Sequence, residues 1–169
     1  SSTEIGFSAY STSGTGEEGS EFEDIGAFLY ALDFSLVKQI PGLSGIVDVK
    51  AQYNSSNVDT ATFIEMHEDG DLEEYSFDNQ SNSFYAQLSY RPTMASSDFV
   101  KKLELVGRYS DFNAPEGAEW EEKSTQYAFG LNYWLSWRSV VKLSYQTTET
   151  EGGHDGDGIT NTNGLFLHW

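Results

Sequence analysis

The chain of 169 residues contains no cysteine, which excludes a disulfide framework and a thiolate metal site. It also lacks any run close to the roughly 18 apolar residues of a membrane-spanning helix. The longest apolar run, Ala27 to Leu32, is far shorter than that. If the chain lies in a membrane, it must therefore cross it as a closed set of strands.

Positive charge is scarce as well: 9 Lys and Arg stand against 27 Asp and Glu, for a formal net charge of -18. A nucleic-acid partner is not expected, because phosphate binding needs clustered basic side chains. No phosphate-cradling loop, zinc-ligand spacing or Ser-centred nucleophile motif is present, so we predict no enzyme, no cofactor and no metal site. No leader segment precedes the strand-like pattern that follows Ser1, which indicates a mature or a truncated product.

What the sequence does contain is a period of two. In Gly45 to Tyr53, the residues Val47, Val49 and Ala51 lie on one face, and polar residues alternate with them on the other. Seven further segments repeat this alternation, so we predict one all-β domain over residues 1–169 with eight strands paired to their sequence neighbours. The predicted strands are Glu4–Tyr10, Phe28–Leu36, Gly45–Tyr53, Phe84–Arg91, Leu103–Ser110, Tyr127–Trp134, Val141–Gln146 and Gly164–Trp169.

The connections between these strands alternate in length and in charge. Four are long and contain 22 of the 27 acidic residues; they cover Ser11–Asp24, Asn54–Asn82, Asp111–Lys123 and Thr147–Asn163. Three are shorter, around Gln39–Gly42, Pro92–Phe99 and Leu135–Arg138. These short connections and their margins carry Lys38, Arg91, Lys101, Lys102 and Arg138 against Asp98 alone. Outer-membrane barrels have short periplasmic turns and longer extracellular loops. We therefore predict a transmembrane antiparallel up-and-down β-barrel in a Gram-negative outer membrane, with long acidic loops outside and both termini in the periplasm.

This localisation implies outer-membrane lipid and lipopolysaccharide as partners. Aromatic residues, 15% of the chain, tend to fall near the strand ends and would form two girdles at the membrane surfaces. The alternative for these rings is ordinary core packing in a soluble β-domain. The predicted girdle residues are Tyr10, Tyr30, Tyr53, Tyr90, Tyr109, Tyr133, Trp134, Trp137, Tyr145 and Trp169.

Two segments carry additional local signals. Asp59–Met66 and Leu72–Phe77 alternate around a turn, and we predict that the third and fourth strands continue through them as an exposed hairpin. At the C-terminus, Leu165, Leu167 and Trp169 share one face of the last strand. This pattern is typical of the signal that outer-membrane barrels present to the barrel-assembly machinery, which we expect as a partner.

Several strands resemble those of the phosphate-selective porin family. Ser83–Pro92 is similar to the family's "YxQxSYxP" strand and Leu103–Ser110 to its "LExVxRY" strand. Gly130–Trp134 with Val140–Gln146 resembles the penultimate hairpin, and Ala31–Tyr53 resembles an earlier one. The matches cover about the last three quarters of the chain, in the order of the family's C-terminal strands. The resemblance implies a channel for passive diffusion of small hydrophilic solutes or ions.

Porin walls have 16 to 18 strands. At roughly 20 residues per strand and connection, such a wall needs about 320 residues, so this chain would supply about half. The remainder would come from a missing barrel half or from a homo-oligomer. We do not extend phosphate selectivity to this chain, because acidic residues share the inner face with the few basic ones.

Six charged residues at mid-strand are predicted to face the lumen. They are Asp33, Asp48, Lys50, Glu104, Arg108 and Lys142. In a wide barrel they would line a pore and select ions. In a barrel of eight strands, whose interior is just filled by side chains, they would form a salt-bridged plug. The alternative function is therefore a complete small plugged barrel with a structural or adhesive role in the envelope.

Two other hypotheses and one candidate ion site remain. A loop-based hydrolase could use His67 or His154 beside carboxylates to activate water. A soluble acidic β-sandwich would fit the composition, but it would not explain why long acidic connections alternate with short ones. Asp155 and Asp157 superficially resemble a calcium loop, yet Phe166 occupies the position of its bidentate Glu, so no calcium site is predicted.

Overall fold

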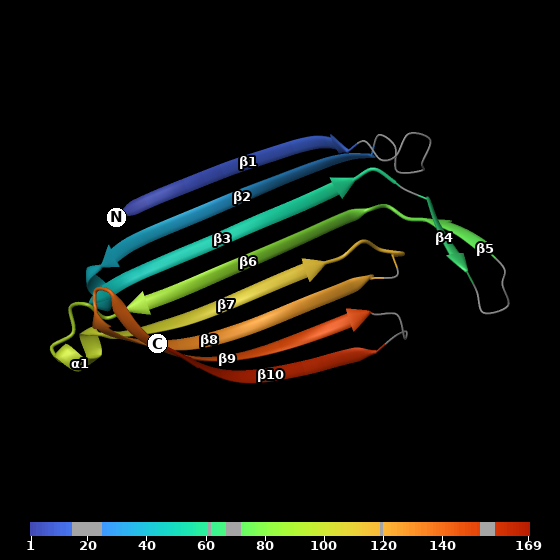
Figure 1. Ribbon diagram of the computed structural model, residues 1–169. Coiled ribbons are helices and arrows are strands. Elements are labelled where there is room, and N and C mark those ends of the chain that lie inside the picture. Colours follow the sequence, from blue (N-terminus) through green and yellow to red (C-terminus); the bar gives the residue numbers. More distant parts are fainter. Residues whose placement is uncertain (15–24, 61, 67–71, 119, 153–157) are drawn as a thin grey trace.

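The computed structural model describes residues 1–14, 25–60, 62–66, 72–118, 120–152 and 158–169. Eight long strands form one antiparallel sheet in which every strand pairs with its neighbour along the chain, apart from an inserted hairpin (Figure 1). The strands of this sheet are β1 (Ser2–Gly14), β2 (Ile25–Ile40), β3 (Gly45–Val58), β6 (Gln80–Arg91), β7 (Leu103–Asn113), β8 (Glu122–Ser136), β9 (Ser139–Gly152) and β10 (Ile159–His168). The prediction of an all-β fold with eight antiparallel strands is confirmed.

The inserted hairpin consists of β4 (Thr62–Met66) and β5 (Leu72–Ser76), which form a separate two-stranded sheet. A hairpin was predicted here, but as a continuation of the third and fourth strands, and that part is wrong. The chain leaves the large sheet at Asp59, whose backbone N–H donates to Gly26 O at 2.9 Å. The Asp59 carboxylate in turn accepts from Gly26 N at 2.8 Å. These bonds tie Asp59 back to β2 and end the pairing of β3.

The strands run several residues further into the long connections than predicted. Thr147 to Gly152, for example, belong to β9 and pair with β8 from Tyr127 to Glu122. Hydroxyl and acidic residues occupy both faces of these extensions, so hydrophobic alternation cannot detect them. Two short helical turns were also not predicted, η1 (Pro41–Leu43) and α1 (Asp98–Lys101). Among the described residues, no helix is long and apolar enough to span a membrane.

The connections sort to opposite ends of the sheet (Figure 1). The strand ends that border the four connections predicted to be long lie at one end, which we call the long-connection end, and β4 and β5 lie beyond it. The three short connections lie at the other end with both chain termini, and we call this the short-connection end. The predicted up-and-down arrangement therefore separates the acidic connections from the basic ones in space.

Cross-strand register gathers apolar side chains onto one face of the sheet, the apolar face. One row joins Ile5, Phe34 and Ala51, and the next strand adds Ala86 and then Tyr109. A neighbouring row joins Leu36, Val49 and Leu88 and, beyond Gly107, continues through Phe129, Tyr145 and Leu165. The opposite face, the polar face, carries Ser, Asn and Gln residues and charged residues such as Lys50, Glu104 and Arg108. This segregation follows from the two-residue period of every strand.

Neither face is covered by a second layer. Leu88 on the apolar face is 54% exposed, whereas its neighbour Ser89 on the polar face is 5% exposed. Side chains converge on the concave side of a curved sheet and spread on the convex side, so the polar face is the concave one. Among the described residues, the buried apolar side chains are Phe77, Ala114, Pro115 and Ala118, all in the connections at the long-connection end.

The sheet has two free edges. β1 pairs only with β2, and β10 pairs only with β9, among the strands that the structure describes. The eight strands thus form a curved wall, and their closure on themselves into a barrel is not seen in this structure.

Candidate functional site: the polar concave face

All six charged residues predicted to face a lumen lie on the polar face. Lys50 stands in one cross-strand row with Gln87 and Arg108. Glu104 stands in another with Asn132 and Lys142. Two further residues, Asp33 and Asp48, share this face by their register with Gln52 and Ser89. Their common face is a property of the fold, while their role in a lumen remains a prediction.

Arg108 is held in place by contacts on its own face. Its guanidinium carbon lies 4.2 Å from the centroid of the Tyr85 ring, a cation–π distance. Its Nε donates a hydrogen bond to Ser110 Oγ at 3.1 Å. No carboxylate among the described residues forms an ion pair with Arg108, so its positive charge is available to a solute.

Lys50 and Asp48 form a loose pair, with 3.7 Å between Nζ and Oδ2. It is the one ion pair on the polar face among the described residues. The other carboxylate oxygen, Asp48 Oδ1, is buried and accepts no hydrogen bond from the protein. Buried polar atoms without a protein partner are rare, and they need water or a solute to satisfy them.

Glu104 belongs to a chain of contacts near the short-connection end. Its Oε2 accepts hydrogen bonds from Trp134 Nε1 at 2.8 Å and from Asn132 Nδ2 at 3.3 Å. The Arg91 guanidinium carbon lies 5.2 Å from the centroid of the Trp134 ring on the same face. The two neutral donors satisfy the Glu104 carboxylate without an ion pair.

Asp33 lies over a glycine of the neighbouring strand. A Cβ placed at Gly6 would fall 2.6 Å from Asp33 Oδ1, so a larger residue here would have to displace the Asp33 side chain. Sequence reasoning did not single out Gly6, because its requirement arises from the pairing of β1 with β2.

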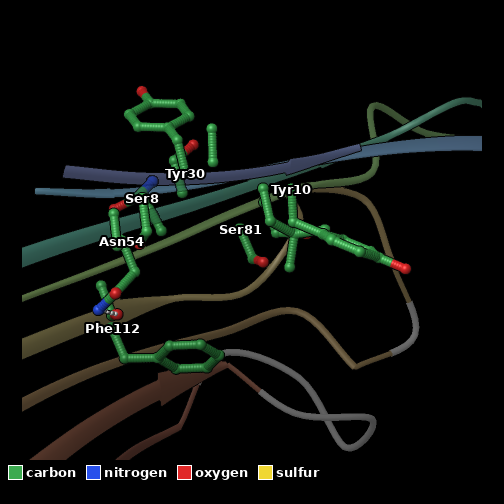
Figure 2. A pocket seen from close by; sticks show the side chains of 13 residues that line it. Ser8, Tyr10, Tyr30, Asn54, Ser81 and Phe112 are labelled. Carbon is green, nitrogen blue, oxygen red and sulfur yellow. Dashed lines mark hydrogen bonds between the residues drawn. The ribbon is translucent and has the colours of Figure 1, made fainter. Parts of the chain in front are cut away.

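Two adjoining pockets lie on the polar face toward the long-connection end. One has a volume of about 340 Å³ and includes Arg108 and Asp111 in its lining. The other has a volume of about 290 Å³ and no charged residue in its lining (Figure 2). They share Asn54, Ser83 and Phe112. Neither pocket was predicted. The signal in the sequence was Phe112, an aromatic residue at a position of its strand where alternation expects a polar one.

The apolar face carries two groups of aromatic side chains. Toward the long-connection end, ring centroids lie 6.0 Å apart for Tyr30 and Tyr53 and 5.3 Å apart for Tyr109 and Tyr127. At the short-connection end, Phe99 packs on Tyr133 with 5.2 Å between centroids, and Trp137 is largely exposed. Leu, Val and Phe residues fill the space between these groups.

Two of the ten predicted girdle residues do not belong to the apolar face. Tyr10 pairs with Leu29 in a row of the polar face. Trp134 donates to the polar-face carboxylate of Glu104. Both were assigned from their nearness to strand ends, which does not determine the face on which a side chain lies.

The C-terminal residues of the predicted assembly signal are exposed. Leu165 and Leu167 lie on the apolar face of β10, and Trp169 follows the end of that strand. His168 lies on the other face, with its ring stacked 6.3 Å from that of Phe166.

The hydrolase and calcium hypotheses concern His67, His154, Asp155 and Asp157, all of which lie outside the described residues. Within the described ranges, no three His, Asp or Glu side chains gather in a group that could hold a metal ion.

Comparisons with family models, with curated proteins and with solved structures find no match to this chain. The resemblance to phosphate-selective porins therefore stays a prediction that rests on the quoted strands alone. What the chain does has to be argued from the two faces of the sheet.

Proposed function

We propose that this chain builds the wall of an outer-membrane channel for passive diffusion of small hydrophilic solutes or ions. The observation that carries the proposal is which side of the curved sheet is polar and which is apolar. The convex face is apolar and uncovered, and the concave face is polar and bears six charged side chains. A soluble β-protein has the reverse arrangement, with its apolar face turned toward a core.

The apolar face needs a cover of hydrocarbon. Leu105 and Phe129, for example, are 57% and 62% exposed at the middle of their strands. Contiguous apolar patches beyond several hundred Å² mark an interaction surface in soluble proteins, and this one crosses eight strands. On β8 it extends from Tyr127 to Tyr133, which is on the order of 20 Å along a strand. Aromatic groups bound it at both ends, as they bound the lipid-facing band of transmembrane barrels.

The concave face supports an aqueous lumen. Its charged residues are spread over β2, β3, β7 and β9, with only one ion pair among them in the described part of the chain. A plugged interior would instead pair these charges across the barrel, because unpaired buried charge is strongly unfavourable. The charges that stay unpaired within the described wall are those that a channel would present to its solutes.

The wall needs more strands than these eight. A closed barrel of eight strands has an interior just filled by side chains, and open edges are not tolerated in lipid. We propose that the free edges of β1 and β10 pair with further strands, from the same chain or from another copy. The 22 acidic residues of the long connections would then surround the extracellular mouth.

Single-channel recording tests the proposal. Protein purified in detergent and added to planar bilayers is expected to produce stable conductance steps. Bilayers that hold the protein, as shown by antibody detection, but carry no steps would contradict the channel and support the plugged alternative. Recovery of the folded protein without detergent would contradict any location in a membrane.

A further inference from the structure

The uncharged pocket on the polar face has a composition unlike the rest of the molecule. Charged residues make up 21% of the chain, yet none of the 13 residues that line this pocket is charged. Its volume of about 290 Å³ is at the lower end of the range for small-molecule sites, roughly 300 Å³. The lining residues are Ser8, Ala9, Tyr10, Leu29, Tyr30, Ala31, Asn54, Ser55, Ser56, Ser81, Asn82, Ser83 and Phe112.

Register explains how five strands contribute to one pocket. Ser8, Ala31 and Asn54 stand opposite one another on β1, β2 and β3, and the same row continues to Ser83 and Phe112 on β6 and β7. The adjoining row contains Tyr10, Leu29, Ser56 and Ser81. Small side chains therefore form the floor, and larger apolar side chains stand at its margins.

The two aromatic residues at the margins, Tyr10 and Phe112, are exposed on the polar face. Tyr10 is 63% exposed and Phe112 is 43% exposed. In Figure 2 both lie on the same side of the sheet as Asn54 and Ser81, whereas the Tyr30 ring points to the opposite side. On a water-facing wall these rings gain nothing from lipid, and beside the uncharged pocket they offer an apolar surface to a solute.

The centre of the pocket offers directed hydrogen bonds. Asn54 Nδ2 donates to Ser83 Oγ at 3.1 Å, and Asn54 Oδ1 accepts from Gln52 Nε2 at 3.1 Å. These two bonds orient the amide and leave one N–H and one lone pair unused. The unused groups, with the serine hydroxyls of the floor, can bind a solute that both donates and accepts.

We propose that this pocket is a binding subsite for a neutral sugar ring, an inference that deepens the proposed channel function and rests on it. A pyranose has apolar faces for Tyr10 and Phe112 and a rim of hydroxyls for Asn54 and the serines. A charged solute would lose water here without meeting an opposite charge. A purely apolar solute would leave the amide and hydroxyls unpaired, which a site of this kind rejects strongly.

Saturation-transfer NMR on the full chain in detergent tests the subsite directly. Methyl glucoside is expected to bind, gluconate to bind at least tenfold more weakly, and cyclohexanol to bind more weakly than the sugar. Phe112→Ala should lower the affinity for methyl glucoside roughly three- to tenfold, the effect of losing one aromatic contact. Asn54→Ala should lower it by a similar factor.

Phe166→Ala is the matched control, because Phe166 is an exposed aromatic residue on the same face but outside the pocket. Equal affinity of the native chain, Phe112→Ala and Asn54→Ala for methyl glucoside would overturn the proposal, as would cyclohexanol binding as tightly as the sugar. Conductance without sugar binding would reject the subsite and keep the channel. Sugar binding without conductance would reject the channel and keep the site.

Discussion

At the residue scale, the charge of Arg108 is the feature of the polar face with the clearest expected effect on ion selectivity. Tyr85 and Ser110 position its guanidinium, and no described carboxylate neutralises it. Lys50 stands in the same cross-strand row but lies 3.7 Å from Asp48 Oδ2. Arg108 is therefore the stronger source of positive potential at mid-height of the proposed lumen.

Replacing Arg108 should change ion selectivity. Arg108→Gln is expected to shift the reversal potential in a KCl gradient toward greater cation preference, because a positive lining charge repels cations. Lys38→Gln removes the same charge from the apolar face and should leave the reversal potential unchanged. A shift of equal size in both variants would contradict the assignment of Arg108 to the lumen.

At the short-connection end, Asp98 provides a prediction about pH. Lys101 donates a hydrogen bond to its carboxylate at 3.0 Å and, together with the nearby charge of Lys102, lowers the pKa of Asp98 below 3.8. Because the pKa of Asp98 is lowered in the folded chain, the Lys101–Asp98 contact persists at any pH above this lowered pKa. It is lost as the pH falls through the lowered pKa and the carboxylate is protonated. Lys101→Ala should raise the pKa back toward 3.8. Carbon-13 NMR of the Asp98 carboxyl during a pH titration measures both values, and identical values would contradict the contact.

At the scale of the strand, neighbouring residues on one strand belong to different environments. Gln87 faces the polar side in a row with Lys50 and Arg108, and Leu88 faces the apolar side. A periodic strand in a transmembrane wall should therefore tolerate charge at alternate positions only.

Adjacent substitutions test this expectation. Leu88→Arg should destabilise the protein in bilayers by about 2–4 kcal/mol, the cost of a basic side chain at the lipid midplane. Gln87→Arg should have a much smaller effect, because its side chain would stay in water. Denaturant unfolding in lipid vesicles measures both. Equal destabilisation by the two variants would contradict the assignment of the faces.

The connections form an element of their own at the long-connection end. Phe77 is 7% exposed and packs on Trp120 with 5.3 Å between ring centroids. Gly117, with a φ of 83°, brings the turn close to Phe77 Cβ. The connection from β3 to β6 is thereby joined to the one between β7 and β8, and this small core stands apart from the sheet.

Phe77→Ala should loosen this core locally. Loss of a buried Phe costs about 3–5 kcal/mol, enough to raise the opening of the connections by more than about a hundredfold. Limited proteolysis should then cut these connections faster, while the denaturant midpoint of the sheet stays unchanged. Phe99→Ala, at an exposed ring of the opposite end, serves as the control. A lowered midpoint for the whole sheet would show that this core stabilises the wall itself.

At the scale of the whole molecule, the two free edges determine what the sheet can become. β1 and β10 lie at opposite sides of the wall, and each has an edge that pairs with no other strand among those that the structure describes. Unpaired edges recruit other strands, and in lipid they must do so. A wall completed by additional strands keeps β1 and β10 apart, whereas a plugged barrel of eight strands brings them together.

Engineered cysteines distinguish these arrangements, because the chain has none of its own. Phe7→Cys combined with Leu165→Cys or Leu167→Cys should form no disulfide within one chain when an oxidant is added. Ile5→Cys with Phe34→Cys joins residues paired in the sheet and is the positive control. Non-reducing electrophoresis measures the outcome, and cross-linking of β1 to β10 would contradict the wider wall.

The sequence by itself determined the local pattern of this protein. Alternation predicted the eight strands, the apolar and polar sets and the shared face of Asp33, Asp48, Lys50, Glu104, Arg108 and Lys142, because the period of two is a property of each strand alone. The lengths of the connections predicted which ends they would share. The strand extensions of β1 and β9 were missed, since their polar residues carry no alternation.

Tertiary structure decided what depends on register between strands. The partners of Glu104, the space that Gly6 leaves for Asp33 and the uncharged pocket between Tyr10 and Phe112 all join residues from different strands. Curvature, which turns the polar set inward, and the free edges of β1 and β10 are likewise properties of the assembled sheet. No single strand encodes them, because pairing brings together residues that lie far apart along the chain.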